Sequence, residues 1–271
     1  MKRGSLLTNA LLWLIALFAL APLAWMVSVS VMAPGEASSF PPPLLPAHPT
    51  FGNFTSLFAD TDMARYLVNS LILAILATAM SLTFNVMAGY AFAKLRFAGR
   101  DRIFRLLLTA LVIPAQVAMI PLFLICKMLG VVDSFAGMLI PSIASVFGIF
   151  LVRQYALSIP DEMLEAARID GASEGRIFRS IVLPTLKPIL ATLGTFSFLG
   201  SWSDFLWPLI ILNDSSKQTL PVALANLSRE HVQDVELMMA GSVVTLLPVL
   251  LLFLLLQRYY IAGLMAGSVK G

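Results

Sequence analysis

The amino-acid sequence predicts an all-α integral membrane protein with six transmembrane helices, and three observations support this fold class. Hydrophobic residues make up 59% of the 271 residues, charged residues make up only 12%, and the mean hydropathy is +0.88. Soluble domains usually carry about 25% charged residues, so lipid is the natural solvent for much of this chain. The charged residues leave six long gaps, whereas the short alternating segments typical of a β-barrel are absent.

Each gap is long enough, or nearly so, for a helix of about 20 residues to cross the hydrocarbon core. The first gap follows Lys2 and Arg3 and ends at Glu36, and the fifth is interrupted only by Asp204. The shortest gap still has 19 residues, at 134–152. The predicted spans of this single domain, residues 1–271, are 6–32, 67–93, 106–126, 134–152, 186–212 and 237–257.

The first span also begins as a signal peptide does, with a short basic start before an apolar run. Here the apolar run extends from about Leu6 to Met32 and contains Trp13 and Trp25. No cleavage site of small residues with an obvious soluble domain follows. We therefore expect a retained helix.

The basic residues predict the orientation, because cytoplasmic loops of membrane proteins are enriched in Lys and Arg. With the N-terminus inside, the inner segments hold 14 of the 18 basic residues. These 14 are Lys2, Arg3, Lys94, Arg96, Arg100, Arg102, Arg105, Arg153, Arg168, Arg176, Arg179, Lys187, Arg258 and Lys270. Both termini are therefore predicted to be cytoplasmic. This topology accounts for the pI of about 9.2, so a nucleic-acid partner is not needed to explain it, and the chain is expected to contact membrane lipid.

Two predicted outer segments, 33–64 and 214–236, are long enough to have roles of their own. A run of prolines from Pro41 to Pro49 favours an extended path over helix in the first of them. Either segment can be a solvated connector or a docking surface.

The predicted cytoplasmic loop 153–185 is long, charged and patterned as two short helices. Pro160 suits the start of a helix, and Asp161 and Glu162 follow at the positive end of its dipole. Gly171 is a typical C-terminal glycine, and Ser173 is a candidate N-cap for the second helix. The sequence therefore predicts a helix, a sharp turn and a second helix that leads back towards the membrane.

The small side chains in this loop favour close approach of a partner protein. They are Ala166, Ala167, Gly171 and Ala172. Glu165 and Asp170 add carboxylates for basic groups of that partner. An amphipathic helix on lipid headgroups is the alternative, but its many carboxylates would then face anionic lipid.

The same loop resembles the EAA signature of the permeases of ATP-binding-cassette importers. The matching residues are Glu165, Ala166, Ala167, Gly171, Ile181, Leu183 and Pro184. Asp170 and Ala172 continue the form that is common in the carbohydrate-uptake branch, and the similarity extends over essentially the whole chain. The chain is similar to the shorter of the two permease subunits of the maltose and glycerol-3-phosphate systems.

The resemblance implies a mechanism and a set of partners. The loop helix would be a coupling helix in a cleft of a cytoplasmic ATPase, where Glu165 pairs with a basic residue, Gly171 allows the turn, and Ala166 and Ala167 pack. Closure of two such ATPases would drive alternating access through a heterodimer with a second permease subunit. An extracytoplasmic solute-binding protein would deliver a sugar or polyol. The location would be the bacterial cytoplasmic (inner) membrane, and ATP and Mg would bind to the ATPases, with no cofactor on this chain.

Polar residues inside the predicted spans are candidates for the translocation path. Asp204 lies in a Trp-rich stretch with Trp202 and Ser203, and three roles stay open for its carboxylate: a sugar contact, a structural partner, or a proton relay. Asn69, Asn85 and Gln116 are interpreted chiefly as polar contacts between helices.

Other function classes are disfavoured. The chain contains no Gly-x-x-x-x-Gly-Lys-Ser/Thr loop, so it is not expected to hydrolyse ATP. His48, His231 and the single Cys126 assemble no metal site or catalytic dyad, so the chain is predicted to be a non-catalytic transport subunit. The alternative is an ion-coupled secondary transporter that uses Asp204.

Overall fold

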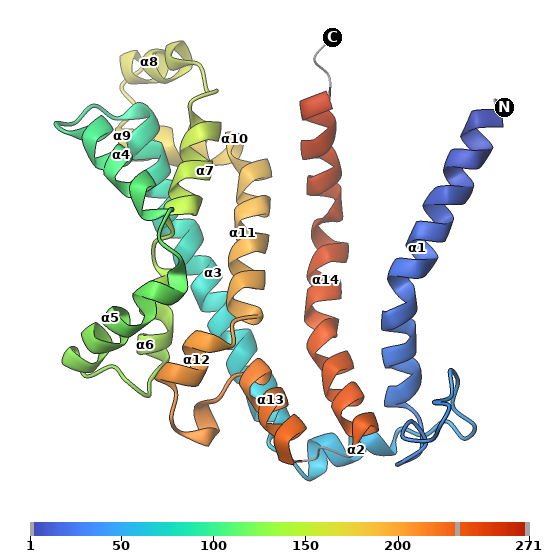
Figure 1. Ribbon diagram of the computed structural model, residues 1–271. Coiled ribbons are helices and arrows are strands. Elements are labelled where there is room, and N and C mark those ends of the chain that lie inside the picture. Colours follow the sequence, from blue (N-terminus) through green and yellow to red (C-terminus); the bar gives the residue numbers. More distant parts are fainter. Residues whose placement is uncertain (1–2, 231–233, 269–271) are drawn as a thin grey trace. The chain divides into compact units, whose positions relative to one another are not determined.

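The computed structural model describes residues 3–230 and 234–268, and every regular element in these ranges is a helix (Figure 1). The predicted all-α fold class is thereby confirmed. Lys2, His231 and Lys270, which entered the sequence analysis, lie outside the described residues. Two compact units make up the chain: a first unit of residues up to Leu67 together with Leu220–Leu250, and a second unit built around Val68–Thr219.

Four helical stretches of the described ranges are long and apolar enough to cross a membrane. They are Thr8–Ser30, Met63–Lys94, Phe135–Ala156 and Val235–Gln257. Two bent helix pairs also qualify if each pair is counted as one span: Arg100–Ala110 with Ala115–Met128, and Glu174–Thr185 with Lys187–Trp202. The described chain therefore has four to six candidate spans, against the six that the sequence predicts.

The first unit contains α1 (Arg3–Ser30), α2 (Gly52–Ala59), α13 (Leu220–Glu230) and the beginning of α14 (Val235–Ser268). The buried amide of Asn53 in α2 donates hydrogen bonds to the backbone oxygens of Ser30 and Met32, at 2.9 and 2.8 Å. This anchor fastens α2 to the end of α1. The prediction of an extended path throughout 33–64 is therefore wrong for α2, which lies beyond the proline run that argued for it.

The third predicted span is sharply bent in the second unit. α4 (Arg100–Ala110) and α5 (Ala115–Met128) meet at 106°. Pro114 lacks the backbone N–H that would continue the helical hydrogen bonds of α4, so the helix ends before it. Pro114 itself has an extended conformation and precedes α5. Hydropathy alone does not detect this bend, since the apolar run continues from the second half of α4 into α5.

The fourth and fifth predicted spans are also interrupted. The fourth consists of α6 (Phe135–Leu139), the 3-10 helix η1 (Ile140–Ser142) and α7 (Val146–Ala156), which Ser145 caps through a hydrogen bond from the Gly148 backbone N–H to its Oγ. The fifth consists of α11 (Lys187–Trp202) and α12 (Leu206–Ile211). A π-helical segment η2 (Phe178–Val182) and the short α10 (Leu183–Thr185) lead into α11 through a 79° bend next to Pro184 and Pro188, as the prolines predicted.

The long helix α3 (Met63–Lys94) forms the centre of the second unit, and α7 packs closely on it. A Cβ added to Gly89 of α3 would lie 2.6 Å from the Cβ of Val152 in α7. A Cβ on Gly148 would lie 2.7 Å from the side-chain nitrogen of Asn85. The two backbones therefore approach each other closely at these glycines, which have no side chain to keep them apart.

Candidate functional site

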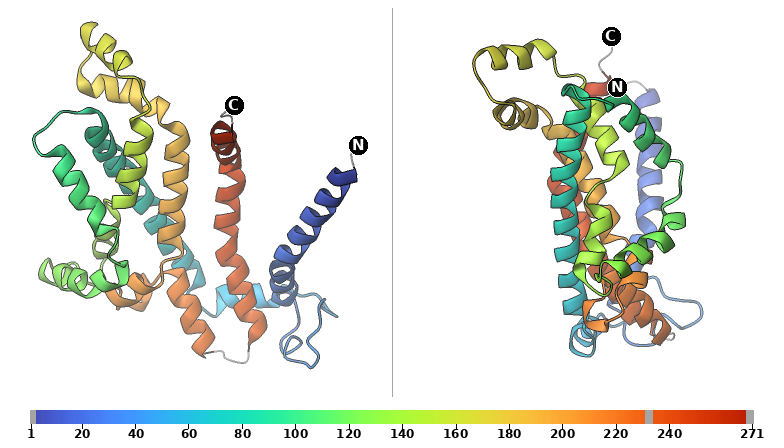
Figure 2. Two further views of the ribbon diagram at one scale, coloured as in Figure 1. Left: turned by 45° about the horizontal axis from the view of Figure 1, so that its top comes forward. Right: turned by 90° about the vertical axis from the view of Figure 1, so that its left-hand side faces the viewer.

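The predicted loop helix is present as α8 (Asp161–Ile169), and it lies beyond the ends of α3 and α7 within the second unit (Figures 1 and 2). Leu164 is 1% exposed and inserts into a hydrophobic core that α3, α7 and α11 share. One turn of α8 is thereby anchored, while its opposite side is left uncovered by the second unit.

A tight turn follows α8. Gly171 has φ of +81°, a left-handed conformation that glycine adopts without strain. Its N–H donates to the Arg168 carbonyl, and the Ala172 N–H donates to the Ala167 carbonyl, both at 3.0 Å. Ser173 then caps α9 (Glu174–Ile177) by accepting a hydrogen bond from the Arg176 N–H. The predicted helix stop and the predicted N-cap are both present.

Two ion pairs hold the ends of α8. At its beginning, the Lys94 Nζ, whose side chain is 5% exposed, donates to an Asp161 carboxylate oxygen and to the Ile159 carbonyl, both at 2.6 Å. The hydrogen bond from Lys94 lowers the pKa of Asp161. At its end, the Arg168 Nε lies 2.7 Å from Oε1 of Glu174, and this hydrogen bond raises the pKa of Arg168.

The uncovered face of α8 combines small, apolar and acidic side chains. Glu162, Ala166 and Ile169 are exposed and lie on one face, because their spacing is i, i+4 and i+7. Ile169 is 86% exposed, and Met163 in the first turn is 46% exposed. This face therefore leaves apolar side chains uncovered beside a carboxylate.

The structure divides the predicted coupling residues into two groups. The exposed group is Glu165, Ala166, Asp170, Gly171 and Pro184. The remaining residues are partly buried and pack against the core of the chain itself: Ala167, Ala172, Ile181 and Leu183. Met163 and Ile169 were not predicted as coupling residues. Each lies three residues from Ala166, a spacing that makes neighbours on a helix surface and is visible in the sequence.

A polar groove of about 810 Å³ runs beside α8. The end of α3, the connection after it and the start of α4 supply Lys94, Arg96 and Arg100, and α8 supplies Glu165 and Arg168. The basic residues predicted for two separate inner loops therefore lie around one groove.

The Asp204 region has a local structural role. The Oδ1 atom of Asp204 accepts a hydrogen bond from the Trp207 backbone N–H at 3.3 Å, at the beginning of α12. Trp202 is 1% exposed and its ring stacks on Phe198 at 5.8 Å, so it is not an open sugar-stacking face in this chain. Ser203 is exposed in the break between the two helices.

The other polar candidates are not gathered in one place. The Asn69 amide donates to the carbonyls of Ser216 and Gln218 and fastens the loop after α12. The Asn85 amide donates to Ser81 and accepts from the Ser145 N–H, so it joins α3 to the start of α7. Gln116 is exposed in the first turn of α5.

Comparison with known proteins gives consistent matches over most of the chain. Residues 85–264 match the family described as binding-protein-dependent transport system inner membrane component. The arabinooligosaccharides transport system permease protein AraQ of Halalkalibacterium halodurans is 39% identical over 245 residues, which cover 90% of this chain and 86% of AraQ. The lactose transport system permease protein LacG of Rhizobium radiobacter is 34% identical over 220 residues, 81% of this chain and 80% of LacG.

A solved structure also matches. A chain from the crystal structure of a bacterial ABC transporter involved in the import of the acidic polysaccharide alginate superposes with a TM-score of 0.85 at 25% identity. The superposition covers 96% of the present chain and 99% of that chain.

Proposed function

The chain belongs to the family of binding-protein-dependent transport system inner membrane components, and from this premise we propose how it works. It is a non-catalytic permease subunit of an ATP-driven importer in the bacterial inner membrane, and it moves a sugar or a related polyol inward. Its partners are a second permease subunit, two ATPase subunits and an extracytoplasmic solute-binding protein. We further propose that ATP and Mg bind to the ATPase subunits.

The uncovered face of α8 carries the proposal for coupling. The small side chain of Ala166 leaves room at the centre of this face for the wall of a cleft in the ATPase. Ile169 offers apolar area, and Glu165 offers a carboxylate to a basic group of the ATPase. The two ion pairs at the ends of α8 join it to α3 and α9, and Leu164 anchors it in the shared core. A push on α8 would therefore move the membrane helices that share its core.

The groove beside α8 supports the orientation. Lys94, Arg96, Arg100 and Arg168 gather at this end of the second unit, and cytoplasmic segments are enriched in basic residues. We therefore infer that α8 faces the cytoplasm, where an ATPase can reach it. The ion-coupled alternative receives no support from the geometry, because the Asp204 carboxylate already has a capping role.

Substitutions on the uncovered face test this function in the complete complex. Ala166→Trp and Ile169→Glu leave the Leu164 anchor intact, so the subunit should fold and pair with the second permease. We expect loss of the ATPase subunits on purification, and at least a tenfold loss of uptake in proteoliposomes. Lys127→Glu, a charge change at an exposed residue near the end of α5, is the control. If both α8 variants keep their ATPases and import normally, α8 is not the coupling surface.

A further inference from the structure

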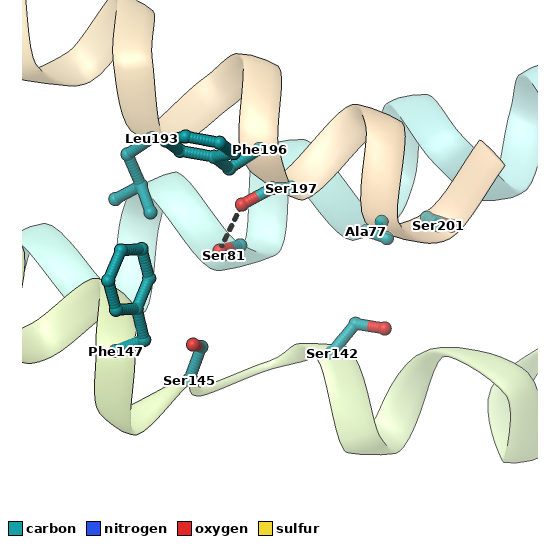
Figure 3. A pocket seen from close by; sticks show the side chains of 10 residues that line it. Ala77, Ser81, Ser142, Ser145, Phe147, Leu193, Phe196, Ser197 and Ser201 are labelled. Atoms are coloured by element: carbon teal, nitrogen blue, oxygen red, sulfur yellow. Dashed lines mark hydrogen bonds between the residues drawn. The ribbon is translucent and has the colours of Figure 1, made fainter. Parts of the chain in front are cut away.

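A second cavity lies among the apolar helices of the second unit, away from α8. It has a volume of about 240 Å³ and lies between α3, α11 and the segment that joins η1 to α7 (Figure 3). Pockets for drug-sized ligands have volumes of about 300–1,000 Å³, so this cavity suits a single small ring. Its lining is unusual for a site among apolar helices, because half of the lining residues are serines.

The serines come from all three sides of the cavity. Ser81 of α3 and Ser197 of α11 share a hydrogen bond of 2.8 Å across its back wall (Figure 3). Asn85 donates to Ser81 at 2.7 Å and accepts from the Ser145 N–H at 2.9 Å, so the back wall is held in place by a buried amide. This network fixes the shape of the cavity.

Other hydroxyls of the lining remain available. Within the described residues, neither the Ser142 hydroxyl nor the Ser201 hydroxyl has a hydrogen-bond partner. The Ser145 oxygen accepts from the Gly148 N–H, which leaves its proton free to donate. Three hydroxyl groups can therefore bond to a ligand without breaking the Ser81–Ser197 contact.

Two phenyl rings face the same cavity. Phe147 of α7 and Phe196 of α11 lie edge to face, with ring centroids 6.1 Å apart, and both belong to the lining (Figure 3). They are 45% and 56% exposed, so this chain leaves much of each ring uncovered. Hydroxyl groups next to open aromatic faces match a sugar ring, which has polar edges and an apolar C–H face.

We propose that this cavity is a translocation subsite for one ring of a neutral saccharide. Ser142, Ser145 and Ser201 bond the hydroxyl groups of the ring, and Phe147 and Phe196 contact its C–H face. No described residue of the lining is charged, so the site offers no counter-ion to a uronate or a phosphate ester. The inference rests on the proposed importer function and narrows its substrate class to neutral sugars.

The cavity also has open space that the chain does not need for its own packing. A Cβ added to Gly200 in the cavity wall would meet no heavy atom within 4 Å. Gly200→Leu is therefore expected to fill the space without straining the backbone. It provides an occluding variant that leaves the Ser81–Ser197 contact and the α8 surface intact.

Cysteine labelling in the complete complex tests the site directly. The single native cysteine, Cys126, is 0% exposed, so background labelling of this subunit, read on its own gel band, should be low. Ser201→Cys should react with a charged, water-soluble thiol reagent, and a neutral saccharide that the complex imports should slow the reaction at least fivefold. The saccharide is chosen by uptake from maltotriose, arabinotriose, lactose and raffinose. An alginate trisaccharide and glycerol-3-phosphate should not protect.

Ser38→Cys, in the exposed loop after α1, is the matched control and should react without protection by any sugar. The proposal is overturned if Ser201→Cys is unreactive in the complex but reactive in the isolated subunit, because the second permease then fills the cavity. Reaction only with a lipophilic reagent would show a lipid-facing surface and would also overturn it. The proposal is also overturned if the acidic compounds protect Ser201→Cys as well as the imported sugar does, or if the imported sugar does not protect it.

Transport measurements separate this inference from the importer function. The Ser142→Ala/Ser201→Ala variant loses two hydrogen-bonding groups and should import with a kcat/KM lowered about tenfold, while it still binds its ATPases. Gly200→Leu should lower uptake further. If these variants import normally but the α8 variants fail, the subsite is wrong and the importer function stands. If the complex imports none of the sugars and binds no ATPase, the importer function itself fails.

Discussion

The Arg168 Nε lies 2.7 Å from Oε1 of Glu174, and this ion pair fastens the end of α8 to the beginning of α9. The same Glu174 carboxylate accepts a hydrogen bond from the Tyr90 hydroxyl of α3 at 3.1 Å. Glu174 therefore connects the proposed coupling helix to a membrane-spanning helix through two side chains. We predict that this connection transmits movement of α8 to α3.

Glu174→Gln should affect transport more than stability. The side chains of the ion pair, Arg168 and Glu174, are 38% and 49% exposed. Surface ion pairs contribute at most about 1 kcal/mol, so the free energy of unfolding should fall by less than that. We expect uptake to fall several-fold while the ATPases remain bound. Uptake per ATP hydrolysed is the measurement. Arg179→Gln, which changes an exposed charge nearby, should leave that ratio unchanged, and an unchanged ratio in Glu174→Gln would refute the connection.

Gly171→Ala should destabilise the turn after α8 through the backbone alone. The φ of +81° costs about 1–2 kcal/mol for a residue with a Cβ, while no heavy atom lies within 4 Å of that Cβ. Thermal unfolding of the purified complex should register the loss. Gly175→Ala is the control, because it also meets open space but has no positive φ. Equal effects of the two substitutions would show that the left-handed turn is not the cause.

Gly89→Ala should disturb the contact between α3 and α7. Its new Cβ would lie 2.6 Å from the Cβ of Val152, and such overpacking usually costs about 1–3 kcal/mol. Adding Val152→Gly should recover part of the stability, because it removes the opposing atoms. Gly194→Ala, whose nearest neighbour is 3.6 Å away, should cost little. Thermal unfolding of single and double variants measures the coupling, and strictly additive losses would argue against the contact.

The Lys94–Asp161 pair predicts an acid-sensitive attachment of α8. Because Lys94 lowers the folded-state pKa of Asp161, the pair contributes stability above the ordinary Asp pKa of about 3.9 and loses it as the pH falls through the lowered value. Amide hydrogen exchange in α8 should therefore accelerate, relative to that in α11, as the pH falls below about 4. Asp161→Asn should exchange faster at neutral pH and lack this additional acid step. An unchanged acid step in the variant would assign it to another group.

Asp204→Asn should preserve transport, because an amide oxygen can accept the Trp207 N–H as the carboxylate does. Asp204→Ala should lower the free energy of unfolding by about 1 kcal/mol, the usual cost of a lost helix cap. Uptake and thermal unfolding of both variants are compared in the same complex. If Asp204→Asn folds but abolishes uptake, the carboxylate itself is required, and the ion-coupled mechanism regains support.

Much of the loop structure could be predicted, because it depends on local chemistry. Gly171 and Ser173 take the turn and cap conformations that their side chains favour wherever they occur. The side of α8 that each residue occupies was harder to predict. Ala166 and Ala167 are adjacent and alike, yet only Ala167 packs on the core, since the Leu164 anchor sets the rotation of the helix.

The sequence by itself determined the helical membrane class, the loop with its turn and the family, because composition, charge spacing and a spaced motif are local properties. Only the tertiary structure decided which polar groups meet. Ser81 and Ser197 are 116 residues apart and share a hydrogen bond, whereas Asp204 and Trp202 are neighbours with separate local roles. Interhelical distances depend on close approach at Gly89 and Gly148 and on the bends near Pro114 and Pro184. These contacts arise from packing between helices, so they cannot be predicted from the periodicity of any one helix.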